Sequence, residues 1–367
     1  MSRVQTDFKS PIAQTVTPLL SWFRLNARDL PWRRTTDPYA IWISEIMLQQ
    51  TQVKTVVPYW ERWVRELPTL RTLAMARTDR VLKLWEGLGY YSRARNAQRA
   101  AKIILEKHGG EFPKSFAELI ELPGIGRYTA GAICSIAFDQ PLPILDGNVV
   151  RVLTRLFAVR CDPAERRTKA RLWSLAESFV LAANEHRVNG DRSCADLNQA
   201  LMELGALICT PANPKCDACP IQKLCGAFQR RCVAKIPAAG ARPQATARRF
   251  VALIAQNRGR FLIRRRPSGV VNAGLWEFPN AEVNRKTPEV LLKNLVDFRF
   301  AKPAPFCTIK HTITRYRITL HVFQASINAA PQVKLGKWCT LYQLHRLAFS
   351  SAHKRIVEKL SAQKPSS

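Results

Sequence analysis

Glu45 is an acidic residue in a largely apolar stretch that runs from Asp37 to Val53. A carboxyl group can donate or accept a proton in acid–base catalysis, so its surroundings decide what chemistry it can do. Asp37 can cap a helix, and Pro38 suits the first helical position. The stretch therefore predicts a helix that begins here and runs to about Thr51.

The neighbours of Glu45 on this helix are large and apolar. Ile41, Trp42 and Leu48 lie three or four residues away, so they share a flank with the carboxyl group. Burial there would raise its pKa, because desolvation disfavours the charged form, and would leave an acid able to donate a proton near neutral pH. The alternative is an exposed glutamate beside Gln49 on the helix surface.

Two glycine turns have features of nucleic-acid contacts. Residues 87–96, GLGYYSRARN, could stack on or wedge between bases, or could form a plain turn between helices with buried tyrosines. Pro123, Gly124 and Gly126 force a tight hairpin with outward-facing backbone N–H groups at the start of a helix. Such a nest binds phosphate, so we interpret this helix-hairpin-helix pattern as a DNA-backbone contact rather than a plain helical hairpin.

A second candidate carboxylate, Asp146, precedes a glycine and is expected to cap or precede a helix from about Asn148. An Asp-Gly pair alone is usually only a turn. The functional interpretation is a carboxylate about twenty residues past the phosphate-binding hairpin that faces a cationic sugar. Sequence distance alone does not place it there.

Four cysteines with the spacing C-x6-C-x2-C-x5-C lie in one short loop: Cys209, Cys216, Cys219 and Cys225. Four thiolates so arranged suit tetrahedral zinc or a four-iron cluster. Zinc sites usually pair two short knuckles across a longer gap, so this compact, asymmetric spacing favours iron–sulfur. The remaining cysteines lack such a pattern and are expected to be packed thiols: Cys134, Cys161, Cys194, Cys232, Cys307 and Cys339.

The overall composition indicates a polyanionic partner. In 367 residues, 57 Lys and Arg against 27 Asp and Glu give a formal charge of +30. This favours nucleic acid, with an anionic membrane surface as the second candidate. No segment approaches the length of a membrane span, so we expect a soluble intracellular protein. The chain is long enough for two domains and shows no internal repeat.

Further helices are predicted at residues 18–26, 56–66, 78–85 and 115–121. Thr78 is expected to cap the third, and Ser115 and Glu118 have capping-box spacing at the start of the fourth. Residues 226–250 are basic and rich in Ala, Pro and Gly, which indicates an interdomain linker. Partly alternating, β-branched segments after it predict an α+β domain.

In their order and spacing, these motifs resemble those of the MutY adenine DNA glycosylases over nearly the whole chain. The motifs are LPWRR (30–34), WISEIMLQQTQV (42–53), GLGYYSRARN (87–96), LPGIGRYTAGAI (122–133), LDGNVVRV (145–152), LNQALMELGALICTP (197–211), the four-cysteine loop and GLWEFP (274–279). The resemblance implies an all-α catalytic domain, with a six-helix barrel, a helix-hairpin-helix and an iron–sulfur subdomain built from both chain ends of that region. A smaller α+β Nudix-like domain follows. The expected ranges are 1–228 for the helical domain with its cluster loop (209–225), 229–247 for a basic linker and 248–362 for the lesion-recognition domain.

The resemblance implies removal of adenine mispaired with 8-oxoguanine or guanine from double-stranded DNA in base excision repair. Glu45 would protonate the flipped adenine and then help to activate water, and Asp146 would stabilise the oxocarbenium-like sugar or bond to it transiently. Asn148 would position the water or the acid. Tyr128, assigned to water or transition-state positioning, stands where bifunctional relatives carry a Schiff-base lysine, so a monofunctional enzyme that leaves an abasic site is expected.

The same motifs assign the remaining site residues. The adenine pocket is expected to contain Leu30, Trp32, Arg33 and Gln199. The lesion strand is expected to meet Gln50, Thr51, Leu88, Tyr90 and Thr314. The DNA backbone is expected to meet Gly124 and Gly126. The ligands of a 4Fe–4S cluster are expected to be Cys209, Cys216, Cys219 and Cys225.

One segment departs from the family pattern. The family commonly has Phe-Ser-His after a His-Thr pair, whereas here His311 and Thr312 precede Ile313, Thr314 and Arg315. Thr314 keeps a hydroxyl for the lesion, and Arg315 could add a phosphate or base contact. The sequence also lacks a Nudix box, so nucleotide hydrolysis by the C-terminal domain is not expected.

Two alternatives compete with this interpretation: an endonuclease-III-like pyrimidine glycosylase, and a non-catalytic iron–sulfur DNA-binding protein. Tyr128, Gln199 and the extra domain argue against the first. The presence of both Glu45 and Asp146 argues against the second, because DNA binding needs neither and a buried acid costs stability. We expect a monomer without a membrane partner, bound to the nucleoid in a bacterial cytoplasm.

Overall fold

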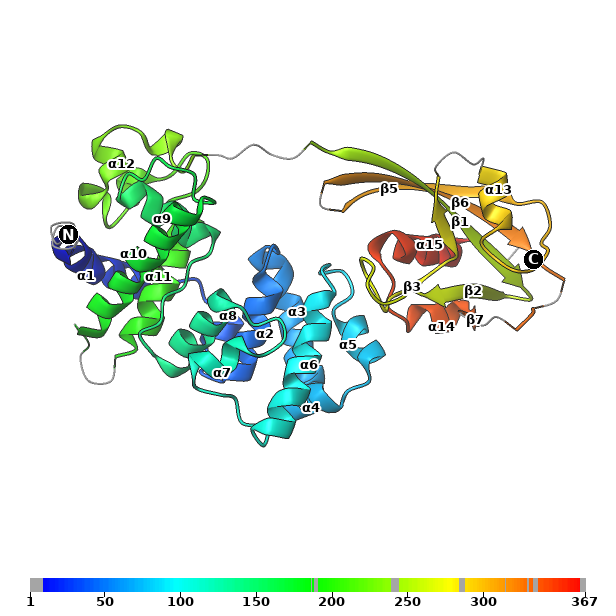
Figure 1. Ribbon diagram of the computed structural model, residues 1–367, viewed down its shortest axis with the longest axis horizontal. Coiled ribbons are helices and arrows are strands. Elements are labelled where there is room, and N and C mark those ends of the chain that lie inside the picture. The colour runs from blue at the N-terminus through cyan, green and yellow to red at the C-terminus, as the bar shows by residue number, and fades with distance from the viewer. Residues whose placement is uncertain are drawn as a thin grey trace. The chain divides into compact units, whose positions relative to one another are not determined.

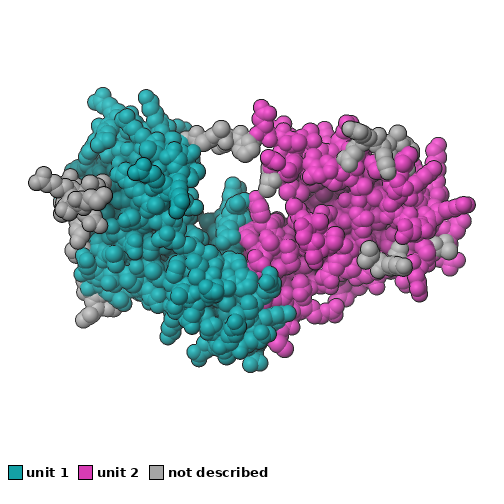
Figure 2. Space-filling model, viewed as in Figure 1, with its two compact units in different colours: residues 1–74, 99–241 teal, residues 75–98, 242–367 magenta. Residues whose placement is uncertain are grey.

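Helices form the first part of the chain, and a mixed sheet with helices forms the last part (Figure 1). The computed structural model describes residues 9–185, 187, 191–238, 244–283, 288–313, 315–328, 330–332 and 336–363. It divides into two units, one of residues 1–74 and 99–241, the other of residues 75–98 and 242–367 (Figure 2). The prediction of a helical region followed by a smaller region that combines strands and helices is confirmed.

The first unit is helical. Its helices are α1 (Lys9–Asn26), α2 (Pro38–Leu48), α3 (Val53–Glu66), α4 (Leu70–Met75), α7 (Phe116–Ile120), α8 (Arg127–Ala132), α9 (Gly147–Leu156), α10 (Arg166–Glu185), α11 (Ser193–Leu207) and α12 (Gly226–Gln229). Shorter turns are η1 (Pro31–Arg33), the π-helical η2 (Ile133–Ala137), η3 (Cys216–Ala218), η4 (Gln222–Leu224) and η5 (Val233–Lys235). Helix α6 (Ser92–Lys107) begins in the second unit and ends in the first.

Helix α2 begins as its sequence predicts. The Asp37 side chain accepts hydrogen bonds from the backbone N–H groups of Tyr39 and Ala40, and Pro38 occupies the first turn. The predicted end at Thr51 is wrong, because the helix stops at Leu48. The reason is local: Gln50 adopts the left-handed conformation, with φ 57°, which an α-helix cannot contain.

Other helix ends also differ from the predictions. Helix α1 is helical from Lys9 onward, with Pro18 inside it, whereas the sequence predicted a start at Pro18. Thr78 is the first helical residue and not a cap, because its hydroxyl donates to Oε1 of Gln98 at 2.9 Å. Ser115 occupies the cap position of α7 without a side-chain hydrogen bond, so the predicted capping box does not form.

The largest core of the first unit joins its two ends. Helix α1 packs against α10 and α11, and α11 packs against α9. Apolar side chains from these helices form one buried cluster, which includes Val16, Leu153, Phe179 and Leu201. The cysteine loop packs against the same cluster. The first helix of the chain therefore shares a core with the helices that precede the cysteine loop, as the resemblance implied.

The second unit contains a sheet. Its strands are β1 (Thr246–Asn257), β2 (Arg260–Arg265), β3 (Trp276–Glu277), β4 (Asn280–Glu282), β5 (Ala304–Ile313), β6 (Tyr316–Ser326) and β7 (Gly336–Thr340). The order is β3-β2-β1-β6-β5, with β4 paired to β1 and β7 paired to β2. The β1–β6 pair is parallel and the others are antiparallel. The helices are α5 (Thr78–Leu84), α13 (Pro288–Lys293), α14 (Leu341–His345) and α15 (Ser351–Ala362).

Strand β1 explains the layers of this unit. Ala252 and Ile254 belong to a core that includes Ile356 of α15, whereas Leu253 belongs to a second core that includes Leu292 of α13. Successive side chains of a strand point to opposite faces, so this alternation places the two helices on the two sides of the sheet. Among the residues that the structure describes, no helix has the length and apolarity needed to cross a membrane.

Candidate active site

A cavity of about 920 Å³ in the first unit brings together most of the predicted site residues. This volume falls within the range of ordinary ligand pockets, roughly 300–1,000 Å³. The predicted residues that line the cavity are Leu30, Trp32, Arg33, Glu45, Gln50, Thr51, Tyr128, Asp146, Asn148 and Gln199. They come from η1, α2 and the turn after it, α8, the start of α9, and α11.

Glu45 is buried in the wall of this cavity, with 4% of its surface exposed. Burial raises its pKa to about 7. A hydrogen bond from the Tyr128 hydroxyl to Oε2, 2.6 Å long, and the charge of Arg33 oppose the rise, and the charge of Asp146 adds to it. The predicted buried carboxyl group with a raised pKa is therefore confirmed, and the surface alternative is wrong.

Tyr128 lies on α8 and faces the carboxyl group of Glu45. Burial and the nearby Glu45 and Asp146 carboxylates raise the pKa of Tyr128 well above its usual value. The phenol therefore stays protonated and acts as a hydrogen-bond donor to Glu45. A phenol has no amine with which to form a Schiff base.

Asp146 caps helix α9, as predicted, and its side chain lines the cavity. Its Oδ1 accepts from the backbone N–H of Val149 at 2.7 Å, and its Oδ2 accepts from Nδ2 of Asn148 at 2.8 Å. Burial raises the pKa of Asp146, and these two hydrogen bonds oppose the rise. The carboxylate is thus fixed in orientation at the start of a helix, where the helix dipole favours negative charge.

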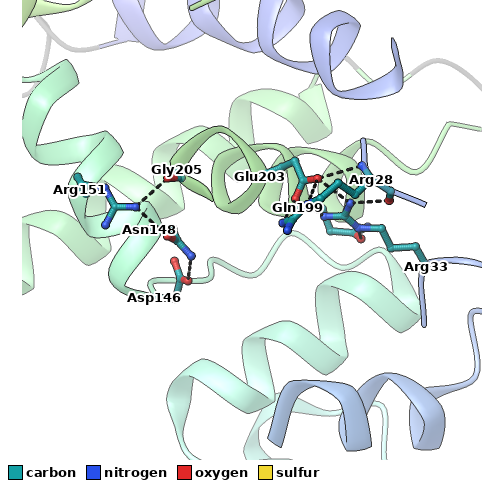
Figure 3. Close-up of polar contacts among 8 residues, drawn as sticks. All are labelled: Arg28, Arg33, Asp146, Asn148, Arg151, Gln199, Glu203 and Gly205. Atoms are coloured by element: carbon teal, nitrogen blue, oxygen red, sulfur yellow. Dashed lines mark hydrogen bonds and ion pairs between the residues drawn. The ribbon is translucent and has the colours of Figure 1, made fainter. Parts of the chain in front are cut away.

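Arg151, which sequence reasoning missed, orients Asn148 (Figure 3). Its Nη2 donates to Oδ1 of Asn148 and to the Gly205 carbonyl, each at 2.8 Å, and its Nε donates to the Cys209 carbonyl at 2.7 Å. A guanidinium group only donates, so the amide oxygen of Asn148 must face Arg151 and its amide nitrogen Asp146. The i, i+3 spacing of Asn148 and Arg151 was the available signal.

Gly205 permits the close approach of α11 to the start of α9. A Cβ atom at Gly205 would lie 2.6 Å from Cβ of Asn148 and 3.0 Å from its Cα and carbonyl oxygen. These distances are too short for nonbonded atoms, so any side chain here would displace Asn148. The position therefore requires glycine for reasons of space.

The other end of the cavity is rich in paired charges (Figure 3). Glu203, on α11, accepts hydrogen bonds from both Arg28 and Arg33, and Nε of Arg33 also donates to Oε1 of Gln199 at 3.2 Å. Sequence reasoning placed Arg33 and Gln199 in the site but missed Arg28 and Glu203. The missed signal was an acidic residue on a largely apolar helix, the same signal that identified Glu45.

Several predicted contacts lie outside this polar network. Gln50 is exposed and Thr51 half-buried in the turn after α2. In the second unit, Tyr90 is 46% exposed, whereas Leu88 is buried with 6% exposure. Thr314 lies outside the described residues.

The predicted phosphate hairpin precedes α8. Gly124 has φ 82°, a left-handed conformation that favours glycine. A Cβ atom at Gly126, the cap residue of α8, would meet no atom within 4 Å. The backbone at Gly126 is therefore open to close approach by a ligand.

The four cysteines of the loop 209–225 are half-buried free thiols. Arg155 Nη1 lies 3.3 Å from Sγ of Cys209, and backbone N–H groups donate to the sulfurs of Cys219 and Cys225. N–H donors around soft thiolate ligands suit an iron–sulfur cluster. In the part of the chain that the structure describes, no three His, Cys, Asp or Glu side chains are arranged to hold a metal ion.

Two family models match the chain. Residues 43–178 match the HhH-GPD superfamily base excision DNA repair protein, and residues 250–359 match the NUDIX domain. The first range contains Glu45, Tyr128, Asp146 and Asn148, and the second lies within the sheet-containing unit. The two models therefore cover the two kinds of fold that the structure shows.

Curated relatives match most of the chain. An adenine DNA glycosylase of Homo sapiens is 34% identical over 95% of this chain and 74% of its own length. An adenine DNA glycosylase of Buchnera aphidicola subsp. Schizaphis graminum is 34% identical over 93% of this chain and 96% of its own. Among solved structures, a thermostable thymine-DNA glycosylase matches 60% of this chain and 98% of its own, with 29% identity and a TM-score of 0.53.

Proposed function

The chain belongs to the adenine DNA glycosylase family, and from this premise we propose that it excises adenine paired with 8-oxoguanine or guanine. It is a DNA N-glycosylase that removes adenine in base excision repair. The observation that carries the proposal is one cavity that contains both a buried carboxylic acid, Glu45, and an oriented carboxylate, Asp146. Hydrolysis of an N-glycosidic bond needs both: an acid for the base and a negative charge for the sugar.

Glu45 is the general acid in this proposal. With a pKa of about 7, it carries its proton at and below neutral pH and can transfer it to a ring nitrogen of an extruded adenine. Protonation makes adenine a better leaving group. The hydrogen bond from Tyr128 fixes Oε2, which leaves Oε1 as the oxygen for proton transfer. After base departure, the same group as carboxylate activates water.

Asp146 faces the sugar in the proposed reaction. Cleavage develops positive charge at the anomeric carbon, and a carboxylate within contact stabilises that charge or bonds to the carbon transiently. Asn148 holds Oδ2 of Asp146 through its amide nitrogen and positions water. Because Arg151 holds the amide of Asn148, the carboxylate needs little reorganisation as charge develops.

The adenine pocket is proposed to consist of Leu30, Trp32, Arg33 and Gln199. Leu30 and Trp32 are buried apolar groups that can pack on the faces of the base. Arg33 and Gln199 supply polar atoms for its edge. An apolar slot with a few convergent polar groups is the usual form of a base-binding pocket.

The reaction is proposed to be monofunctional. Tyr128 stands in place of the amine that a strand-cleaving mechanism requires. Water, and not an amine of the protein, therefore adds to the anomeric carbon of the sugar and leaves an abasic site. Borohydride should therefore trap no covalent protein–DNA adduct, and strand breaks should appear only after alkali. Efficient trapping, or breaks without alkali, would contradict this step.

Duplex DNA is proposed to meet the protein on several further groups. Gln50, Thr51, Leu88, Tyr90 and Thr314 approach the strand opposite adenine. The backbone at Gly124 and Gly126 meets phosphate, consistent with the formal charge of +30. The protein acts as a monomer, associated with the nucleoid of a bacterial cytoplasm through its DNA affinity.

Cys209, Cys216, Cys219 and Cys225 are proposed to hold a 4Fe–4S cluster. Bound there, the cluster would supply a rigid cross-link of the loop and a centre capable of electron transfer. The measurement is iron and sulfide content per chain together with visible charge-transfer absorbance. Stoichiometric zinc in place of iron would contradict the proposal.

The proposed domains are residues 1–228 for the glycosylase, 229–247 for the linker and 248–362 for lesion recognition. The function is tested by single-turnover base release from duplexes that carry A opposite 8-oxoguanine, A opposite G, or A opposite T, each with and without alkali. Release from the first two and little from the third is expected. Equal release from all three, or none from the first, would contradict the proposal.

A further inference from the structure

Glu203 is a buried carboxylate in the lining of the cavity, and the proposed mechanism does not use it. Its side chain is 1% exposed and lies on α11. Arg28 donates to it through Nε (2.8 Å), Nη2 (2.7 Å) and its backbone N–H (2.9 Å). Arg33 donates through Nη2 (3.0 Å) and Nη1 (3.2 Å). One carboxylate therefore holds two guanidinium groups, each through both of its oxygens.

These contacts fix Arg33, which lines the proposed adenine pocket. Besides Glu203, Nη1 of Arg33 donates to the Arg28 carbonyl at 3.0 Å, and its Nε donates to Oε1 of Gln199. All three of its side-chain nitrogens thus have partners. Because a guanidinium group only donates, the amide oxygen of Gln199 must face Arg33. The orientation of the Gln199 amide, and so the polar edge offered to a base, depends on where Glu203 places Arg33.

Glu203 also affects the charge around the proposed general acid. The titratable and charged groups that face Glu45 are Tyr128 from α8, Asp146 from the start of α9, and Arg33 from η1. The positive charge of Arg33 lowers the pKa of Glu45 and so opposes its proton-donating state. A carboxylate hydrogen-bonded to Arg33 offsets part of that positive charge.

We propose that Glu203 is a positioning residue, which clamps Arg33 and Gln199 as the base-reading edge of the cavity and balances the charge of Arg33 opposite Glu45. This inference rests on the proposed function, because it assigns Glu203 to the adenine-binding step and to proton transfer. Glu203 itself touches neither base nor sugar. It acts through Arg33 and Gln199, with Arg28 as the second arm of the clamp.

The test compares Glu203→Gln and Glu203→Asp with the wild-type holoprotein. The control is Asp29→Asn, which removes an arginine–carboxylate pair from the same segment: the Asp29–Arg34 pair is exposed and lies outside the cavity lining. Single-turnover release of adenine, duplex affinity and melting temperature are measured for each protein between pH 5 and pH 9. Asp29→Asn is expected to match the wild type in all of them.

Glu203→Gln is expected to slow base release about 10- to 100-fold, because a shift of about 1 Å in a positioned group can cost about 100-fold, with duplex affinity nearly unchanged. Its fall in rate at alkaline pH should begin at a lower pH than in the wild type, because the unbalanced charge of Arg33 favours the Glu45 carboxylate. Glu203→Asp keeps the charge but is one methylene shorter. It should release base more slowly than the wild type, but its rate should begin to fall at the same alkaline pH as that of the wild type.

Two results would overturn the inference. The first is a folded Glu203→Gln protein with the rate and pH profile of the wild type, or a Glu203→Asp protein with the full rate. The second is an equal loss of duplex affinity and base release with an unmoved pH profile, which would show a structural role. If Glu203→Gln does not fold, Glu203→Asp decides alone. The proposed function is tested by base release from the wild-type protein alone, without the Glu203 variants. The proposed function and the role of Glu203 can therefore fail independently.

Discussion

The cavity is lined by two buried glutamates, Glu45 and Glu203, whose carboxyl groups are held in opposite protonation states. Glu45 is 4% exposed and has a pKa of about 7, whereas Glu203 is 1% exposed and has a pKa of about 2. Both belong to largely apolar helices, α2 and α11. Burial alone would favour the neutral form of both groups.

Their partners account for the difference. Burial raises the pKa of Glu203, but hydrogen bonds from Arg28 and Arg33 outweigh it and lower the value to about 2. Glu45 faces a phenol, a carboxylate and the already paired Arg33, so desolvation remains dominant. The protonation state of each buried acid is therefore set by its partners. One cavity can contain a protonated acid that acts in catalysis and an ionised carboxylate that positions other side chains.

The largest effect is expected from replacement of the protonated member of the pair. Glu45→Gln should slow adenine release about 10³- to 10⁴-fold, because the amide cannot protonate the base. Duplex binding should be largely retained, since Gln is isosteric and can still accept from the Tyr128 hydroxyl. Single-turnover kinetics and duplex titration measure the two quantities. If duplex binding collapses together with base release, Glu45 is structural.

Asp146 is a third carboxyl group in the cavity, and its replacement should have the second largest effect. Asp146→Asn removes the negative charge and keeps an oxygen for the Val149 N–H. Base release should fall about 10²- to 10³-fold, the usual cost of losing one electrostatic group from a transition state. A drop of less than threefold in single-turnover experiments would remove Asp146 from the reaction.

Replacement of the two buried glutamates by glutamine should change the free energy of unfolding in opposite directions. The folded pKa of Glu45 is raised from 4.5 to about 7, so its contribution to stability is fully present below pH 4.5 and is lost as pH rises through 7. Glu45→Gln should therefore stabilise the protein by up to about 3 kcal/mol at pH 8 and by little at pH 4. Glu203→Gln should destabilise the protein by about 3 kcal/mol at both pH values, because it leaves the half-buried guanidinium groups of Arg28 and Arg33 without their carboxylate.

Urea denaturation of both variants at pH 4 and pH 8 provides this measurement. The wild type at the same pH is the reference. If Glu45→Gln is less stable than the wild type at pH 8, the pKa assigned to Glu45 is wrong. If Glu203→Gln is as stable as the wild type, the arginine clamp contributes nothing to the fold.

A methyl group added at Gly205 should disturb Asn148, and through it Asp146, less severely than replacement of a carboxyl group. Gly205→Ala should cost about 1–3 kcal/mol of stability, because the added methyl overlaps Asn148. Base release should also fall, since Asn148 holds Asp146. Thermal denaturation and single-turnover kinetics report the two effects, and Gly126→Ala, where the methyl meets no neighbouring atom, is a steric control for stability.

The smallest expected effect is that of Tyr128→Phe, which should change the pH at which the rate of base release begins to fall. The hydrogen bond from Tyr128 lowers the pKa of Glu45, so Tyr128→Phe should raise that pKa and move the alkaline fall in rate upward. The displacement should be about one pH unit or less, since one unit corresponds to about 1.36 kcal/mol, close to the net value of a hydrogen bond. A downward displacement would show that the phenol oxygen instead accepts a hydrogen bond from the protonated carboxyl group of Glu45.

Local sequence patterns predicted the features that local chemistry decides. Glu45 could be placed because its neighbours on one helix are apolar, and Asp37 and Asp146 could be assigned as caps because a cap depends on the next few residues. The strands of the second unit followed from β-branched, partly alternating segments. Each of these inferences uses residues within a few positions of one another.

Predictions that depend on distant partners failed or were not made. Arg28 and Glu203 are 175 positions apart, so no spacing rule could pair them. Thr78 does not cap α5 because its hydroxyl meets Gln98, twenty positions away. The end of α2 was misplaced for a different, local reason: Gln50 adopts a left-handed conformation, although the sequence has neither glycine nor proline at that position.

The most direct test of the account is the pH dependence of single-turnover adenine release by the wild type between pH 5 and pH 9. Glu45 acts while protonated, so the rate should be nearly constant below its pKa of about 7 and should fall tenfold per pH unit above it. The fall should be absent from the residual activity of Glu45→Gln. A rate that rises with pH through 7 would contradict proton donation by Glu45.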